Sequence, residues 1–197
     1  SETMKVCLVT VGATASFLKL VRQVLSEPFL ACLKQHDYTH LLVQYGKDGK
    51  PIMDEFLANN PDGSESLHGI GIGGFDFKPN LDSSIRLAMA DEAKNQEQGL
   101  MITHAGTGSI LEGLRAQLPL IVVPNTDLAD NHQEQLAIEL DRTKYAVNTL
   151  VEDLVSAVAK AESMRHQRPG MNGAHESSQE NEMQISRAMA DQLATLD

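Results

Sequence analysis

"MITHAGTGSILEG" (101–113) joins an apolar run to a turn broken by glycines, and the turn to a helical pattern. Residues 99–104 are typical of a buried strand, and apolar positions at helical spacing follow from about Ser109. A strand that passes through a tight turn directly into a helix is the repeating unit of a parallel sheet covered by helices. This seam therefore predicts the fold class, and its polar residues are candidates for a binding site.

The rest of the chain repeats the alternation of strand and helix. Apolar, β-branched runs predict strands at 4–12, 40–46, 67–77, 99–104 and 119–124. Helical spacing predicts helices at 17–33 with an interruption at Pro28, at 53–58, from Leu81 to Ala93, and at 109–116, 131–142 and 149–164. We therefore predict an α/β fold: a single Rossmann-like domain over residues 1–164, with an open parallel sheet and helices on both faces.

The composition changes near residue 165. Residues 165–182 have almost no apolar anchor, so we expect a flexible linker there. Residues 183–197 recover an apolar face made by Ile185, Met189, Leu193 and Leu196. A short isolated helix is marginal in water, so this segment is expected to dock either on the domain or on another chain.

Composition and charge exclude some partners. The formal net charge of −11 argues against a nucleic-acid partner, because phosphate backbones are bound by clustered Lys and Arg. Cys7 and Cys32 have neither metal-ligand nor redox-motif spacing, which favours two buried free thiols. No signal-peptide pattern and no apolar run of about 18 residues is present, so we expect a soluble cytosolic chain.

The seam itself has the features of an anion site. Ligands of parallel sheets bind at the carboxyl ends of the strands, and His104 stands at such an end. Gly106 and Gly108 allow a ligand close to the main chain, and the N-terminus of the following helix favours negative charge. Ser109 and His104 add donors, the histidine either protonated or through its neutral N–H. This pattern predicts a phosphate or diphosphate cradle; alternatively the glycines only close the turn and Ser109 only caps the helix.

Glu112 lies three residues after Ser109, on the same side of the predicted helix. A carboxylate beside a phosphate would be repelled unless it binds hydroxyl groups, and a ribose diol is the natural partner of such a contact. Alternatively Glu112 is an ordinary acid in the first turn, favoured by the helix dipole.

Two further strand ends carry candidates. The stretch "VVPNTDLADNHQEQ" (122–135) offers several hydrogen-bonding side chains to a polyhydroxylated ligand, namely Asn125, Asp127, Asp130, Asn131, His132 and Gln133. The alternative is a solvated loop in which Asp130 caps a helix. After the first strand, Gly12 and Thr14 lie in a small-residue turn that could form a further backbone nest for phosphate.

Several familiar motifs are missing. "GIGIGG" (69–74) lacks the order of a dinucleotide fingerprint, and no P-loop, H-E-x-x-H or G-x-S-x-G sequence occurs. No Asp-x-Asp pair is present either, so we expect no metal and no cofactor, with the helix N-terminus neutralising the phosphate charge.

Taken together, "VTVGAT" (9–14), "THAGTGSILEGL" (103–114), "PLIVVP" (119–124) and "DNHQEQLA" (130–137) resemble the donor-binding half of two-domain nucleotide-sugar glycosyltransferases of family 28. More narrowly, they resemble the small cytosolic subunits of UDP-N-acetylglucosamine transferases that act on dolichol-linked sugar. The resemblance covers about residues 4–150. Related plant enzymes carry a tryptophan and an asparagine where this chain has Thr107 and Gly108.

The resemblance implies site residues and a reaction. It assigns the diphosphate to His104, Gly106, Gly108 and Ser109 and the ribose to Glu112. It places Asp130, Asn131, His132 and Gln133 near the sugar or the nucleotide. The implied reaction is inverting transfer of N-acetylglucosamine from UDP-N-acetylglucosamine to N-acetylglucosaminyl-diphosphodolichol, which forms a β1,4 bond. The general base is not identified; it is expected on a partner or at His132.

The resemblance also implies a partner. One Rossmann-like half without a membrane anchor needs a membrane-anchored, acceptor-binding subunit, which would bring the dolichol-linked acceptor and recruit this chain to the cytosolic face of the endoplasmic reticulum. Two other functions stay open. The chain could be a stand-alone UDP-nucleotide-binding regulatory module, or a self-sufficient nucleotide-sugar epimerase or hydrolase that uses His104 or His132 as base.

Overall fold

The computed structural model describes residues 2–13, 15–128 and 131–165, together with the single positions 183, 186, 187 and 190. In this part of the chain six parallel strands form one sheet in the order β3-β2-β1-β4-β5-β6. The strands are β1 (Val6–Thr10), β2 (His40–Gln44), β3 (Gly71–Phe75), β4 (Leu100–His104), β5 (Leu120–Val123) and β6 (Val147–Asn148). The order runs outward from the middle to both edges, as in a doubly wound sheet. The predicted α/β fold with an open parallel sheet is confirmed.

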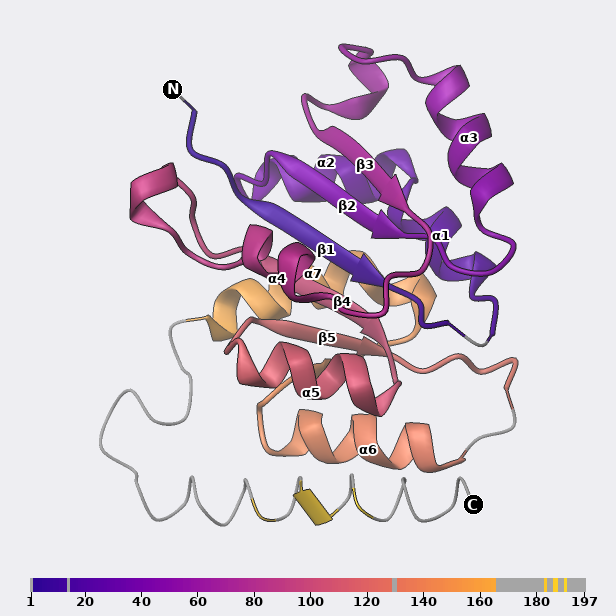
Figure 1. Ribbon diagram of the computed structural model, residues 1–197, viewed down its shortest axis with the longest axis vertical. Coiled ribbons are helices and arrows are strands. Elements are labelled where there is room, and N and C mark those ends of the chain that lie inside the picture. The colour runs from indigo at the N-terminus through magenta and orange to yellow at the C-terminus, as the bar shows by residue number, and fades with distance from the viewer. Residues whose placement is uncertain are drawn as a thin grey trace.

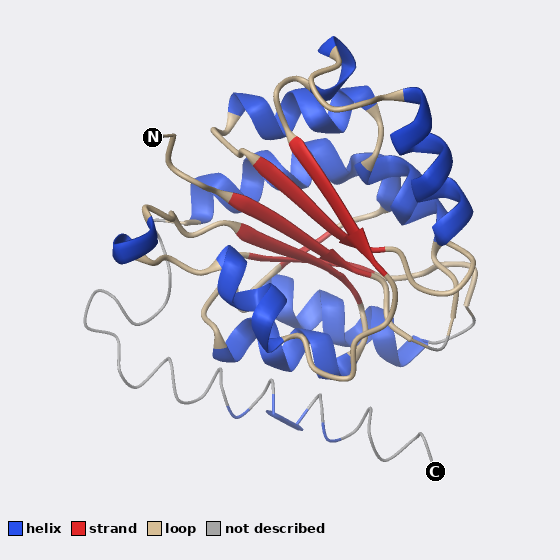
Figure 2. Cartoon of the chain, turned by 45° about the horizontal axis from the view of Figure 1, so that its top comes forward, coloured by secondary structure: helices blue, strands red, loops and turns tan. Residues whose placement is uncertain are grey.

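Helices cover both faces of the sheet (Figures 1 and 2). They are α1 (Leu18–Val24), α2 (Glu27–Gln35), α3 (Lys50–Asn59), α4 (Asp82–Ala88), α5 (Thr107–Arg115), α6 (Asn131–Arg142) and α7 (Leu154–Met164), with short 3-10 helices η1 (Glu65–Leu67), η2 (Glu92–Lys94) and η3 (Val151–Asp153). Side chains from α1, α2 and α7 pack on one face, where they meet Val9 and Ile102. Side chains from α4, α5 and α6 pack on the other face, where they meet Leu8 and Met101. The strand side chains alternate between the two cores because successive residues point to opposite faces.

Four elements differ from the sequence prediction. The predicted helix at 53–58 is longer and begins at Lys50, with Pro51 in its first turn, where no helical N–H is required. Helix α4 ends at Ala88, well before the predicted Ala93, which lies in η2. The side-chain amide of Gln96 donates to the carbonyls of Arg86 and Met89 and so closes the end of α4. The predicted helix at 149–164 begins with η3 and becomes α-helical at Leu154. Strand β6 was not predicted, because two residues give no readable periodicity.

A hydrogen-bonded cluster closes the edge of the sheet where the strands begin. Arg165, just after α7, donates to the carbonyls of Gln98 and Gly99 at 2.9 and 3.1 Å. The same guanidinium donates to Glu162, which also accepts from the Tyr38 hydroxyl. Burial would raise the Glu162 pKa, yet the donors Arg165 and Tyr38 hold it below its usual range. This cluster fixes α7 to the amino ends of β1 and β4. The opposite edge of the sheet, where the strands end, is left open to ligands.

Other sequence predictions have different outcomes. Cys7 and Cys32 are buried free thiols, as predicted. Among the described residues, no helix combines the length and apolar character needed to cross a bilayer. The predicted linker beyond Arg165 lies outside the described residues, as do most positions of the predicted helix at 183–197. The domain boundaries therefore stay a prediction.

Candidate functional site

A cavity of about 250 Å³ opens where strands β1 to β4 end. Figure 2 shows the strands converging toward this edge, among the loops that follow them. The lining of the cavity comes from four segments: the turn after β1, the end of β2, the β3–α4 segment and the β4–α5 seam. The lining residues are Gly12, Ala13, Gln44, Phe77, Lys78, Pro79, Leu81, His104, Gly106, Gly108, Ser109 and Glu112. The cavity thus lies at the edge where parallel sheets bind ligands.

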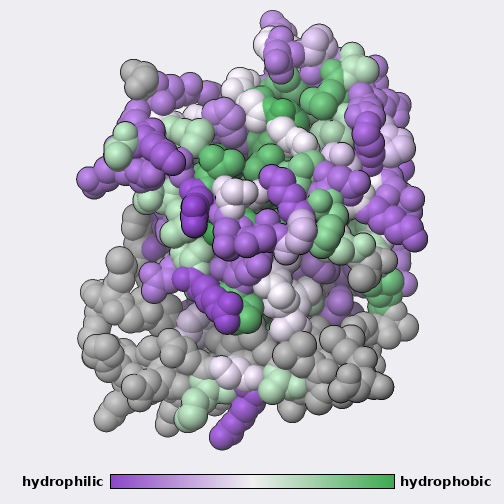
Figure 3. Space-filling model, in the orientation of Figure 1, coloured by the Kyte–Doolittle hydropathy of each residue, from purple (hydrophilic) through white to green (hydrophobic). Residues whose placement is uncertain are grey.

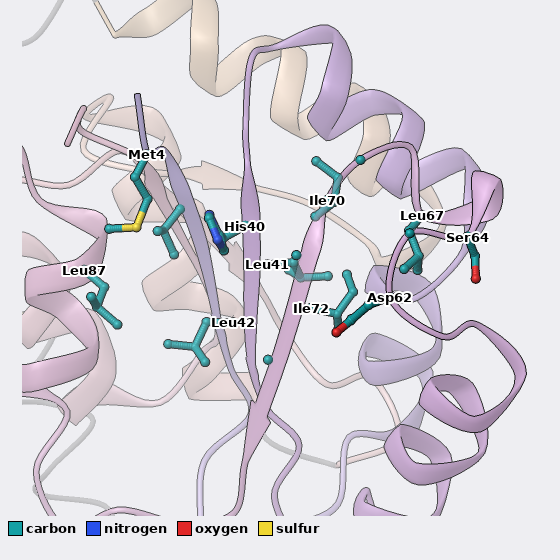
Figure 4. A pocket seen from close by; sticks show the side chains of 15 residues that line it. Met4, His40, Leu41, Leu42, Asp62, Ser64, Leu67, Ile70, Ile72 and Leu87 are labelled. Carbon is teal, nitrogen blue, oxygen red and sulfur yellow. The ribbon is translucent and has the colours of Figure 1, made fainter. Parts of the chain in front are cut away.

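A larger cavity of about 520 Å³ lies elsewhere, over β2 and β3. Most side chains labelled around it in Figure 4 are aliphatic, including Met4, Leu42 and Leu87. Figure 3 shows hydrophobic residues exposed in the upper half of the view, where Figure 1 places these two strands. The lining of this larger cavity includes Asp62, Ser64 and several glycines, but no described residue of the β4–α5 seam lines it. We therefore regard the smaller cavity as the candidate site.

The ring of His104 fills the space between two glycines. A Cβ atom added to Gly12 would lie 2.5 Å from Nε2 of His104, and one added to Gly106 would lie closer still. Gly12 also has a φ of +82°, which side-chain-bearing residues rarely adopt. These two glycines are needed to seat the imidazole at the end of β4, a role that the sequence prediction did not foresee.

Burial controls the charge of His104. It lowers the pKa of the imidazole to about 4, although a hydrogen bond to the Thr10 backbone opposes this shift. The ring is therefore neutral near pH 7. Of the two forms considered for its role at the seam, protonated or neutral N–H donor, burial favours the neutral form. Thr10 and Thr103 share a buried hydroxyl hydrogen bond of 2.7 Å beside it, which ties β1 to β4.

Helix α5 begins two residues earlier than predicted, at Thr107. Its N-cap is Gly106 in an extended conformation, and no side chain caps it. The alternative in which Ser109 is the helix cap is therefore wrong; Ser109 is the third residue of the helix. A Cβ atom added to Gly108 would meet nothing within 4 Å, so the first turn is open on that side. N–H groups of a first turn have no acceptor within their own helix, which makes this end suited to an anion.

Glu112 lies one turn further along α5 and lines the same cavity as Gly108 and Ser109. Burial is the main cause of its raised pKa, with a smaller contribution from Asp82 and an opposing one from Arg115. The structure thus brings an anion-suited helix end and a half-buried carboxylate into one space. Such a pair can accept a ligand that carries both a phosphate and hydroxyl groups.

The other predicted residues that the structure describes with their side chains do not line this cavity, Gly12 excepted. Thr14 and Asp130 lie outside the described residues, and Asn131 is described only as the first residue of α6. His132 is exposed and Gln133 half-buried, and neither lines the cavity.

Asn125 and Asp127 have other contacts. The buried side chain of Asn125 donates to the carbonyl of Ser16 at 3.1 Å and accepts from the Asp127 N–H. Asp127 lies 3.7 Å from the ammonium of Lys19. The Asn125 amide thus holds the β5 loop against the β1 loop, and its predicted contact with a ligand stays a prediction.

Six lining residues were missed by the sequence analysis: Ala13, Gln44, Phe77, Lys78, Pro79 and Leu81. Gln44 is buried, and its Oε1 has no hydrogen-bond partner among the described residues. A signal for these residues existed, since all of them follow or end strands whose carboxyl ends share one edge. Within the described part of the chain, no group of three or more His, Cys, Asp and Glu side chains is arranged as metal ligands would be.

Comparison with known proteins places these features in context. Residues 6–190 match the model of the glycosyltransferase family 28 C-terminal domain. The UDP-N-acetylglucosamine transferase subunit ALG13 of Eremothecium gossypii is 34% identical over 177 residues, which cover 81% of this chain and 83% of that protein. The protein of the same name from Saccharomyces cerevisiae is 35% identical over 153 residues, which cover 68% of this chain and 71% of that protein.

Solved structures show the same fold. The NMR solution structure of ALG13 matches with a TM-score of 0.58 and 28% identity, over 83% of this chain and 87% of that one. The crystal structure of MurG from Acinetobacter baumannii matches with a TM-score of 0.56 and 18% identity, over 83% of this chain but 42% of that chain. The second match concerns the fold alone, and its coverage agrees with one half of a two-domain GT-B architecture.

Proposed function

The chain belongs to the glycosyltransferase family 28 C-terminal domain family, and from this premise we propose that it is the donor-binding subunit of a UDP-N-acetylglucosamine transferase. The observation that carries the proposal is the single cavity shared by the N-terminus of α5 and by Glu112. A nucleotide sugar presents a diphosphate and a ribose diol at a short separation. Those are the two groups that this helix end and this carboxylate can bind.

The proposed residue roles follow from this arrangement. Gly106, Gly108 and Ser109 offer main-chain and hydroxyl donors to the diphosphate, with His104 as a neutral neighbour and Glu112 on the ribose. For Gly12 and Thr14 we retain the role of further main-chain donors to the phosphates, carried over from the sequence prediction. For Asp130, Asn131, His132 and Gln133 we retain a role near the sugar or the nucleotide, carried over from the family resemblance.

The proposed reaction is an inverting displacement. The hydroxyl of N-acetylglucosaminyl-diphosphodolichol attacks C1 of the donor sugar, the bond from C1 to the UDP oxygen breaks, and a β1,4 bond forms. The hydroxyl proton passes to a base on the partner or to His132. Fixed main-chain donors aimed at the departing diphosphate need no reorganisation, and one such donor can contribute about 3 kcal/mol.

We propose that transfer requires a membrane-anchored, acceptor-binding partner at the cytosolic face of the endoplasmic reticulum. One Rossmann-like half supplies one wall of a two-domain cleft, and the relatives are named as subunits. We expect no transfer to a diphosphodolichol acceptor by the purified chain, and transfer after the partner is added. Transfer by the chain alone would contradict the partner requirement, and release of UDP or free sugar by the chain alone would favour a hydrolase or epimerase.

An NMR titration tests the donor site directly. UDP-N-acetylglucosamine and UDP are expected to shift the amide signals of residues 104–112, whereas ATP leaves them in place. Shifts at 130–133 with the nucleotide sugar only would support the sugar contact there. Equal binding of UDP and UDP-N-acetylglucosamine would favour a regulatory nucleotide-binding module, and no response to any uridine ligand would overturn the proposed site.

A further inference from the structure

We propose that Lys78 is the cation that holds the diphosphate of the donor in this cavity. The inference rests on the proposed function and adds a residue that neither the sequence motifs nor the family resemblance singled out. Lys78 lies in the β3–α4 segment, which leaves the sheet at β3, three places away from β4 in the strand order. It thus reaches the cavity from a different part of the fold than helix α5 does.

The charges around the cavity point to this role. Lys78 is the only Lys or Arg among the described residues that line the cavity, and Glu112 is the only carboxylate. No described carboxylate lies within ion-pair distance of the Lys78 ammonium. An exposed lysine with no ion pair among the described residues, on a chain of net charge −11, is available to a negatively charged ligand.

The ammonium of Lys78 is also positioned. It lies 4.4 Å from the centre of the Phe75 ring, a cation–π distance. Phe75 is the last residue of β3 and packs against the core on the α4 face, so the ring is a fixed support. A lysine held over a ring loses less side-chain entropy when it meets a ligand than a lysine that moves freely in solvent.

The ligand chemistry needs such a charge. A nucleoside diphosphate carries more negative charge than the roughly half-unit positive charge of one helix N-terminus can offset. Glu112 in the same cavity repels the phosphates further. A lysine ammonium adds a full positive charge, and it can donate up to three hydrogen bonds to phosphate oxygens. As UDP departs, the same ammonium would stabilise the charge that develops on its oxygens.

The test compares Lys78→Met with Lys78→Arg, and uses Lys94→Met as a control for the loss of one positive charge, although Lys94, unlike Lys78, pairs with an aspartate, Asp91. Lys94 lies in η2, which precedes β4, so the control makes the same charge change at the opposite edge of the sheet. Binding of UDP-N-acetylglucosamine, UDP and uridine is measured by NMR titration at low and high salt. We expect Lys78→Met to lower the affinity for UDP-N-acetylglucosamine and for UDP by about tenfold at low salt and by less at high salt. Lys78→Met should bind uridine as the wild type does. The variants Lys94→Met and Lys78→Arg should bind the diphosphates with nearly wild-type affinity, and the thermal unfolding of all three variants should be unchanged.

Each outcome has a distinct meaning. If the wild-type chain binds the diphosphates and Lys78→Met binds them equally well, the proposed role of Lys78 is wrong while the proposed function stands. If Lys78→Met lowers the affinity for uridine as much as the affinity for UDP, or if the loss of affinity does not depend on salt, the side chain acts by packing. The inference is then also wrong. If the wild-type chain binds none of the uridine ligands, the proposed function is wrong and this inference with it.

Discussion

Gly106→Ala is expected to lower the free energy of unfolding by about 3 kcal/mol, the upper part of the range for overpacking a well-filled site. The new Cβ atom would overlap the imidazole of His104, which is hydrogen-bonded to the Thr10 backbone. Gly106 has an ordinary negative φ of −85°, so backbone strain contributes little and the effect reports the steric overlap. Urea unfolding of the purified chain measures it, and the same variant should lose UDP binding because the N-cap of α5 moves.

Gly108→Ala is the matched control, two residues further along the chain, in the first turn of α5. Its new Cβ atom meets nothing within 4 Å, and alanine is favoured over glycine in a helix, so stability should rise by about 0.5–1 kcal/mol. Because this Cβ would point into open space beside the lining residues of the cavity, UDP-N-acetylglucosamine binding should nevertheless weaken. A residue that weakens the fold but favours the ligand is a sign of selection for binding.

A double-mutant cycle identifies the clash partner. In a His104→Ala background the ring is gone, so Gly106→Ala should be nearly neutral, and the coupling energy between the two sites should approach the full cost of the single substitution. If Gly106→Ala remains equally destabilising without the ring, the overlap with His104 is not its cause. If Gly106→Ala costs no more than Gly108→Ala in the wild-type background, the packing described for His104 is wrong.

The sequence predicted the fold well because the strands of the inner sheet are strongly patterned. β1 and β5 are buried along their whole length and β4 up to its last residue, and buried parallel strands appear as short continuous apolar runs. β6 could not be found this way. Its two residues are too few for a pattern, and only their pairing with β5 makes them a strand. Likewise α4 ends where the Gln96 side chain reaches its carbonyls, a contact that no local propensity encodes.

The candidate site was predicted only in part, for a physical reason. The motif "HAGTGS" is contiguous, so its residues could be grouped without knowing the fold. Phe77 and Lys78 come from a segment far away in the chain and reach the cavity through the strand order. The glycines were interpreted as room for a ligand, whereas Gly12 and Gly106 make room for the His104 ring. Of these three glycines only Gly108 faces open space.

The free energy of unfolding should depend on pH through the titration of His104. Its pKa is about 4 in the folded chain, against 6.5 for an unperturbed histidine, because burial disfavours the charged ring. Between these two values the unfolded chain binds a proton that the folded chain does not, so folding becomes less favourable as the pH falls. The contribution is fully present above about pH 6.5 and is lost progressively down to about pH 4, up to about 3 kcal/mol in total.

His104→Gln isolates this contribution, because glutamine does not titrate. Urea unfolding of the wild type and the variant is compared at about pH 7 and about pH 4.5. We expect the wild type to lose about 2 kcal/mol more than the variant between these conditions, by the same proton linkage. Carboxylates whose pKa is lowered by their partners, such as Glu162, also lose stability in acid, but they do so in both proteins and cancel in the comparison. Equal losses in the two proteins would show that the ring takes up its proton in the folded state as readily as in the unfolded one, and that it is not enclosed between Gly12 and Gly106 as described.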